Sequence, residues 1–141
     1  MTPQAADTSG AKILIVDDKP ENLRLLTRIL KEAGHTVRQL RNGKMVMSSV
    51  DSAPPDLILL DILMPETDGY EVCRQLKSHE NTLDIPVIFI SALNDTADKV
   101  RAFSSGGVDY IAKPFQEEEV LARVRTHLSL RHLHRQLEAR N

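Results

Sequence analysis

Short apolar runs alternate along the chain with segments whose apolar residues recur at helical spacing. The middle runs are apolar on consecutive residues, which indicates strands that are covered on both faces. The runs are Lys12 to Val16, Val37 to Leu40, Leu57 to Leu60, Val87 to Ile90 and Tyr110 to Ala112. This alternation predicts an α/β fold with a doubly wound, five-stranded parallel sheet.

Helical periodicity fills the gaps between these runs. Segments around 23–30, 70–76 and 100–103 predict helices, and the first stops before Gly34, a suitable C-terminal residue. Asp68 and Asp95 precede the other two as candidate N-caps. The segment 43–51 carries the weakest helical pattern.

The last predicted helix continues to the end of the chain. Its acidic start and basic end suit the helix dipole, with Glu117, Glu118 and Glu119 first and Arg131, Arg135 and Arg140 last. Two leucine-rich stripes lie on about opposite faces: Leu121, Val124 and Leu128, and then Leu130, Leu133 and Leu137. We expect the first stripe to cover the sheet, the second to stay uncovered, and His127, His132 and His134 to lie on a solvated face.

These patterns divide the chain into three parts. Residues 1–11 are small and polar and predict a flexible leader. Residues 12–128 have the size of one globular domain. Residues 129–141 form a C-terminal helical extension, which we expect to act as a linker or a dimerisation helix.

The composition indicates which partners the protein can bind and in which cellular compartment it works. The 18 basic and 20 acidic side chains leave a net charge of −2, which offers no general attraction for nucleic acid. A single cysteine, Cys73, excludes an internal disulfide and fits a reducing compartment. Because the N-terminal stretch lacks a cationic start and an apolar run, we expect a cytoplasmic protein without membrane insertion.

Carboxylates follow two of the predicted strands. Asp17 and Asp18 close the first run, and Asp61 closes the third. The carboxyl ends of parallel strands meet at one edge of a sheet, so these groups are expected to converge. Because unpaired carboxylates in a dry site repel one another, the cluster predicts a hard divalent cation, and Mg²⁺ suits a site that also receives phosphate.

Two more strand ends add groups that phosphoryl chemistry requires. Ser91 offers a hydroxyl group and Lys113 offers a cation. Asp61 is then the candidate nucleophile, with Lys113 and the metal stabilising the charge on the phosphoryl oxygens.

Four sequence blocks carry a resemblance to a known family. They are Ile-Val-Asp17-Asp18, Leu-Leu-Asp61-Ile-Leu-Met-Pro65-Glu-Thr-Asp68-Gly69, Ser91-Ala92 and Lys113-Pro114-Phe115. In this order they resemble the receiver domains of bacterial two-component response regulators, across residues 12 to about 128. The resemblance implies a flavodoxin-like (βα)5 receiver fold.

The resemblance also implies roles for individual residues. Asp61 is phosphorylated by a histidine kinase or a histidine phosphotransfer protein, and Mg²⁺ is held by Asp17, Asp18, Asp61 and the backbone carbonyl of Leu63. Ser91 and Lys113 stabilise the phosphoryl group. Ser91 and Tyr110 switch the surface of the fourth helix, fifth strand and fifth helix toward a downstream protein target or output domain. The Lys113-Pro114 bond matches one that is often cis in this family.

Leu63 and Leu93 match the positions that border the path of the hydrolytic water in this family. Both are apolar, so we expect slow autodephosphorylation and no other enzymatic turnover. A homodimer through the C-terminal helix is one expected route of output.

Two alternatives remain at this point. A haloacid-dehalogenase phosphatase also uses an Asp nucleophile, but it requires a second Asp where Leu63 stands. A degenerate receiver that acts only as a phosphorylation-independent interaction module is less consistent with the complete set of site residues.

Overall fold

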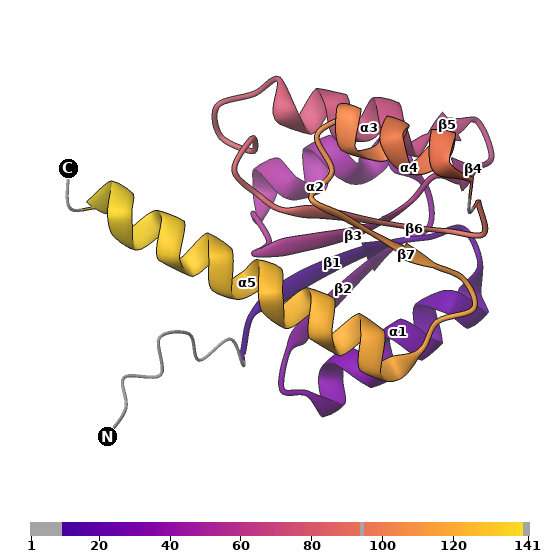
Figure 1. The fold of residues 1–141 in the computed structure, drawn as a ribbon, viewed down its shortest axis with the longest axis horizontal. Coiled ribbons are helices and arrows are strands. Elements are labelled where there is room, and N and C mark those ends of the chain that lie inside the picture. The colour runs from indigo at the N-terminus through magenta and orange to yellow at the C-terminus, as the bar shows by residue number, and fades with distance from the viewer. Residues whose placement is uncertain (1–9, 94, 140–141) are drawn as a thin grey trace.

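A five-stranded parallel sheet forms the centre of the computed structural model, which describes residues 10–93 and 95–139 (Figure 1). The strands are β1 (Lys12–Val16), β2 (Thr36–Leu40), β3 (Leu57–Asp61), β6 (Val87–Ser91) and β7 (Asp109–Ala112). They pair in the order β2-β1-β3-β6-β7, and every pair is parallel. This is the strand order of flavodoxin-like doubly wound folds, so the predicted fold class is confirmed.

Two helical layers cover the sheet. Helices α1 (Pro20–Glu32) and α5 (Glu117–Ala139) lie on one face, and α2 (Val46–Ser52), α3 (Gly69–Lys77) and α4 (Thr96–Ser104) lie on the other (Figure 1). Side chains of β1 alternate between the two layers: Ile13 and Ile15 belong to the core under α1 and α5, and Leu14 and Val16 to the opposite core. Burial of each such side chain contributes about 1.5–3 kcal/mol, which is why the central strands β1, β3 and β6 are apolar on consecutive residues.

The predicted elements agree with the structure in position, and local contacts set their ends. Four of the five predicted strands gain one residue, namely Thr36, Asp61, Ser91 and Asp109. Helix α1 ends before Gly34, which adopts φ +96°. Asp68 caps α3 by accepting the Tyr70 N–H, whereas Asp95 occupies the N-cap of α4 without a side-chain bond. The weak segment at 43–51 forms a 3-10 turn, η1 (Gly43–Met45), followed by α2.

A short hairpin after β3 was not predicted. Strands β4 (Leu63–Met64) and β5 (Thr67–Asp68) pair in antiparallel register, and Glu66 between them has φ +59°. Each strand has only two residues, which is too short for an alternating pattern to be recognised in a sequence.

Helix α5 continues without a break to Ala139, past the edge of the sheet (Figure 1). Val120, Val124 and Leu128 are buried, while Leu130, Leu133 and Leu137 are 55%, 42% and 61% exposed. The two-stripe prediction is therefore confirmed, although Val120 takes a more buried place than Leu121. The proposed boundary at residue 128 stays a prediction. The leader at 1–11 falls mostly on residues outside the described part, as does Arg140.

Two polar side chains of α5 have contacts that the sequence did not predict. Arg131, which the sequence placed at the basic end of the helix, is only 9% exposed, and its Nη1 donates to Asp56 Oδ1 at 3.0 Å. Asp56 Oδ2 also accepts the Lys12 N–H at 2.8 Å, which joins α5 to the starts of β1 and β3. His127 contacts Asp109 Oδ2 at 2.9 Å and is not solvated, whereas His132 and His134 are exposed as predicted.

Within residues 10–93 and 95–139, no helix has both the length and the apolar character needed to cross a membrane.

A substitution at Gly69 tests how closely the chain after the hairpin packs on the end of β3 at Asp61. A methyl group at Gly69 would lie 2.3 Å from the Asp61 carbonyl oxygen and 2.7 Å from Ile62 Cα, both backbone atoms. Because backbone atoms cannot move aside, we expect Gly69→Ala to lower the free energy of unfolding by about 3 kcal/mol, the upper end of what overpacking costs, measured by urea denaturation.

Gly10→Ala is the matched control, because nothing lies within 4 Å of the added methyl group and only its φ of +80° is unfavourable. Its cost should stay near the roughly 1–2 kcal/mol of a left-handed residue. Equal or smaller losses at Gly69 would contradict the packing argument.

Candidate functional site at the carboxyl edge of the sheet

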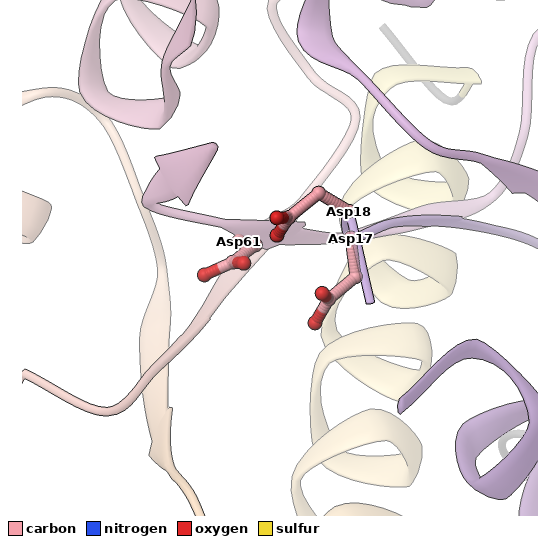
Figure 2. A group of neighbouring side chains, drawn as sticks. All are labelled: Asp17, Asp18 and Asp61. Atoms are coloured by element: carbon pink, nitrogen blue, oxygen red, sulfur yellow. The ribbon is translucent and has the colours of Figure 1, made fainter. Parts of the chain in front are cut away.

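Three carboxylates meet at the carboxyl edge of the sheet. Asp17 and Asp18 follow β1, and Asp61 is the last residue of β3 (Figure 2). One carboxylate oxygen from each lies within 4.8 Å of the others. Asp17 and Asp61 are 0% and 2% exposed, so two of the three charges lie in a nearly dry environment.

Local hydrogen bonds fix the orientation of Asp17. Its Oδ1 accepts the Lys19 N–H at 2.9 Å, and its Oδ2 accepts from Asn22 Nδ2 at 3.2 Å. These contacts turn the chain from β1 into α1 and hold one carboxylate at the edge. Asn22 was not among the predicted site residues.

Lys113 supplies a positive charge to this cluster. Its Nζ lies 3.2 Å from Asp17 Oδ2 and 3.4 Å from Asp61 Oδ2. The lysine follows β7, and its backbone N–H donates to the Ser91 carbonyl at 2.8 Å. The Lys113-Pro114 bond is cis, as the resemblance implied.

Burial raises the pKa of Asp61 to about 6, and the neighbouring Asp17 charge adds to the increase, while Lys113 opposes it. One ammonium group therefore does not fully compensate the carboxylates. A bound cation would offset the remaining negative charge.

The donor set fits a hard divalent cation. Asp18 Oδ1 is buried and accepts no hydrogen bond within the described part of the chain, so it is available as a ligand. Carboxylate oxygens are the ligands that Mg²⁺ and Ca²⁺ prefer in proteins. The cluster can thus hold a metal ion, as the sequence predicted.

Ser91 and Tyr110 meet at the backbone of Leu93. Strand register places Ile90 beside Asp61, so Ser91, the next residue, lies at the same edge. Its Oγ accepts the Leu93 N–H at 3.0 Å. The Tyr110 hydroxyl donates to the Leu93 carbonyl, and Tyr110 is 7% exposed.

Leu63 and Leu93 lie beyond the carboxylate cluster. Leu63 is in β4, two residues after Asp61, and is 60% exposed, whereas Leu93 packs partly on the core. Cys73 is fully buried in α3, and burial raises its pKa to about 11.

Residues 13–125 match the family model of the response regulator receiver domain. The chain belongs to this family. Its function as a receiver domain of two-component response regulators follows, and the flavodoxin-like fold agrees with it.

Relatives and neighbours of this receiver carry different names, and the match covers different shares of their length. It is 44% identical over 81% of its length to the DNA-binding dual master transcriptional regulator RpaA of Synechocystis sp. and covers 47% of that protein. It is 40% identical over 86% of its length to a probable cyclic di-GMP phosphodiesterase of Vibrio cholerae and covers 27% of it. The receiver domain of a histidine kinase from Syntrophus aciditrophicus has a TM-score of 0.79 and 39% identity, with 85% of this chain and 91% of that one covered.

The chain therefore spans about half the length, or less, of these curated relatives. Their shared part is the receiver.

The raised pKa of Asp61 predicts a pH-dependent stability. Its folded value of about 6 exceeds its ordinary value of 3.8, so the folded state binds the proton more tightly, and this group's contribution to stability is lost as pH rises through that interval. In metal-free buffer, Asp61→Asn should raise the free energy of unfolding at pH 7.5 by roughly 1–3 kcal/mol.

This gain should shrink as the pH falls from about 6 toward 3.8, because the Asp61 carboxyl group of the folded wild type becomes protonated in that interval, and urea denaturation across pH 4–8 measures it. Asp51→Asn, at an exposed position in α2, is the control and should show no comparable gain. A constant difference between Asp61→Asn and the wild type at all pH values would rule out titration of Asp61 as its cause.

Proposed function

We propose that this receiver accepts a phosphoryl group on Asp61 from a histidine kinase or a histidine phosphotransfer protein. One observation carries the proposal: the Asp61 carboxylate lies at the edge of the sheet, in contact with Lys113 and close to two further carboxylates. A carboxylate nucleophile, a cation and a metal-ligand set are the groups that phosphoryl transfer requires.

In the proposed reaction an Asp61 carboxylate oxygen forms a bond to phosphorus as the bond between phosphorus and the donor histidine nitrogen breaks. Lys113 moves no proton; its ammonium group balances charge on the phosphoryl oxygens. The Ser91 hydroxyl, which accepts the Leu93 N–H, retains its own proton to donate to a phosphoryl oxygen.

Mg²⁺ is the cofactor that we propose for this site, held by Asp17, Asp18, Asp61 and the backbone carbonyl of Leu63. When bound, it neutralises charge on the phosphoryl oxygens. The unpartnered Asp18 Oδ1 supports this assignment.

Ser91 and Tyr110 are the proposed switch residues. Both bond to the backbone of Leu93, which precedes α4. When Ser91 turns toward the phosphoryl group, its bond to the Leu93 N–H is altered. Tyr110 bonds the carbonyl of the same residue, so the change reaches the surface of α4, β7 and α5.

Output is proposed to pass from this surface to a downstream protein or an attached output domain, in the cytoplasm. RpaA is named as DNA-binding and the Vibrio cholerae relative as a probable cyclic di-GMP phosphodiesterase. Such activities would reside outside the receiver. For the receiver itself we propose no direct contact with nucleic acid and no membrane insertion. The exposed stripe of Leu130, Leu133 and Leu137 supports a homodimer or linker through α5. Enzymatic turnover is limited to self-phosphorylation and slow autodephosphorylation.

Neither alternative function is favoured by the geometry. A phosphatase of the haloacid-dehalogenase type needs an acid two residues after the nucleophile, where Leu63 offers only an alkyl group. A degenerate receiver would not need the charge-linked set of Asp17, Asp61 and Lys113.

Asp61 should gain one phosphoryl group when the chain is incubated with Mg²⁺ and acetyl phosphate. Intact-mass measurement should show the added mass on wild type and none on Asp61→Asn, and removal of Mg²⁺ by a chelator should abolish it. Elution in size exclusion, measured on the same samples, reports whether phosphorylation changes assembly.

A chain that binds Mg²⁺ but gains no mass would instead support the degenerate receiver. Added mass that persists in Asp61→Asn would place the phosphoryl group on another residue.

Leu63 is predicted to slow hydrolysis of the acyl phosphate, because an alkyl group neither orients nor activates water. Leu63→Gln should shorten the lifetime of phosphorylated Asp61 by about tenfold, a fraction of the effect of an optimised general base. Leu93→Gln should act in the same direction. The measurement is the decay of the phosphorylated mass after removal of the donor.

Leu83→Gln is the matched control, since Leu83 is 48% exposed and precedes β6 at the opposite edge of the sheet. Equal decay rates in Leu63→Gln, Leu93→Gln and wild type would show that these leucines do not slow hydrolysis of the acyl phosphate.

A further inference from the structure

Helix α4 has little hydrophobic anchorage. Within Thr96–Ser104, which the structure describes completely, only Ala102 is buried, and Val100 and Phe103 are 58% and 53% exposed. A helix with so few buried apolar contacts depends on individual polar and aromatic contacts for its position.

Tyr70 provides several such contacts from α3. It is 3% exposed, and its hydroxyl donates to the backbone carbonyl of Asp98 in the first turn of α4 at 3.1 Å. The Arg101 guanidinium carbon lies 4.3 Å from the centre of its ring, within the range of a cation–π interaction. The ring of Phe89 in β6 packs against Tyr70 at 5.5 Å between centres.

Arg101 also reaches the hairpin that follows Asp61. Its Nη2 lies 3.4 Å from Asp68 Oδ2, across an open groove of about 660 Å³ that is lined by residues 62–68 and Arg101. The other oxygen of Asp68 accepts the Tyr70 N–H at 2.9 Å. One carboxylate thus orients both partners of the Tyr70–Arg101 pair.

The start of α3 is also linked to the residues that follow Asp61, the proposed phosphorylation site. The Gly69 N–H donates to the carbonyl of Ile62 at 2.9 Å, and Ile62 directly follows Asp61. Contacts therefore run from the residue after Asp61, through Gly69 and Tyr70, to α4. This route does not include Ser91 or Tyr110.

We infer that Tyr70 and Arg101 form a second clamp on α4, and that Tyr70 is a positioning residue for the output surface. Tyr110 bonds the Leu93 carbonyl before α4, and Tyr70 bonds the Asp98 carbonyl within it. The two hydroxyl groups hold neighbouring parts of the chain in one arrangement, in which both rings are buried. The clamp itself is a property of the fold, while its regulatory consequence rests on the proposed phosphorylation of Asp61.

Tyr70→Phe removes the hydroxyl group and keeps the ring against Phe89 and Arg101. Loss of one net hydrogen bond of about 0.5–1.5 kcal/mol corresponds to a roughly two- to tenfold increase in local opening. We expect amide hydrogen exchange in α4 to rise by that factor in the unphosphorylated chain, with little change in α1 and α5. Arg101→Gln should change α4 exchange in the same direction, because it removes the cation from the ring and from Asp68.

Ser78→Ala is the matched control. The Ser78 hydroxyl donates to the Gln75 carbonyl at 2.8 Å at the far end of α3, so this variant also removes a bond from a hydroxyl group to a backbone carbonyl. Its α4 exchange should match wild type. Unchanged α4 exchange in Tyr70→Phe, or an equal increase in all elements, would overturn the clamp.

A second arm tests the regulatory part with acetyl phosphate and Mg²⁺. Tyr70→Phe should gain the phosphoryl mass as wild type does, while its α4 exchange stays faster than that of the phosphorylated wild type. Equal α4 exchange in the two phosphorylated proteins would overturn the regulatory part. If wild type gains no phosphoryl mass, the proposed function fails and the regulatory part with it, whereas the exchange rates of the unphosphorylated variants still decide the clamp.

Discussion

Burial of the parallel sheet on both faces is the constraint on which the other features depend. Every strand must bring apolar side chains to both layers, and every connection between parallel strands must cross back over a face. Turns that begin at the carboxyl ends of strands consequently share one edge. Asp17, Asp61 and Lys113 meet there because three different strands end at that edge.

The same constraint creates an electrostatic problem, because carboxylates at the edge of a dry core are poorly solvated. Burial and mutual repulsion raise the pKa of Asp61 to about 6 even with Lys113 in contact. Such a site has a strong tendency to take up positive charge, and it can then accommodate an anionic phosphoryl group. The buried carboxylates lower the stability of the folded protein, and a bound cation would restore it. Functional sites commonly have this property.

At the opposite edge, polar contacts have a different role. Asp56 joins the backbone of Lys12 to the buried Arg131, so the part of α5 that passes the sheet is fastened to two strand starts. Helix α5 is therefore held beyond Leu128, its last buried apolar residue in the described part of the chain. By contrast, the only buried residue of α4 (Thr96–Ser104) is Ala102, so this helix has almost no apolar anchorage. The receiver thus combines a firmly attached helix with one whose position depends on a few specific bonds.

The sequence by itself determined the strands, the order of the elements and the candidate Asp61 site, because these depend on periodicity and on residues that close apolar runs. The hairpin at 63–68 was beyond prediction, since two-residue strands have no detectable period. Only the tertiary structure decided that Arg131 is buried against Asp56, 75 residues away in sequence, and that His127 contacts Asp109. It alone also brought Tyr70 to Asp98 and Arg101, because such contacts depend on how layers pack in space. Periodicity reports which face of an element is buried, whereas the partner of a polar side chain depends on distances that no local pattern records.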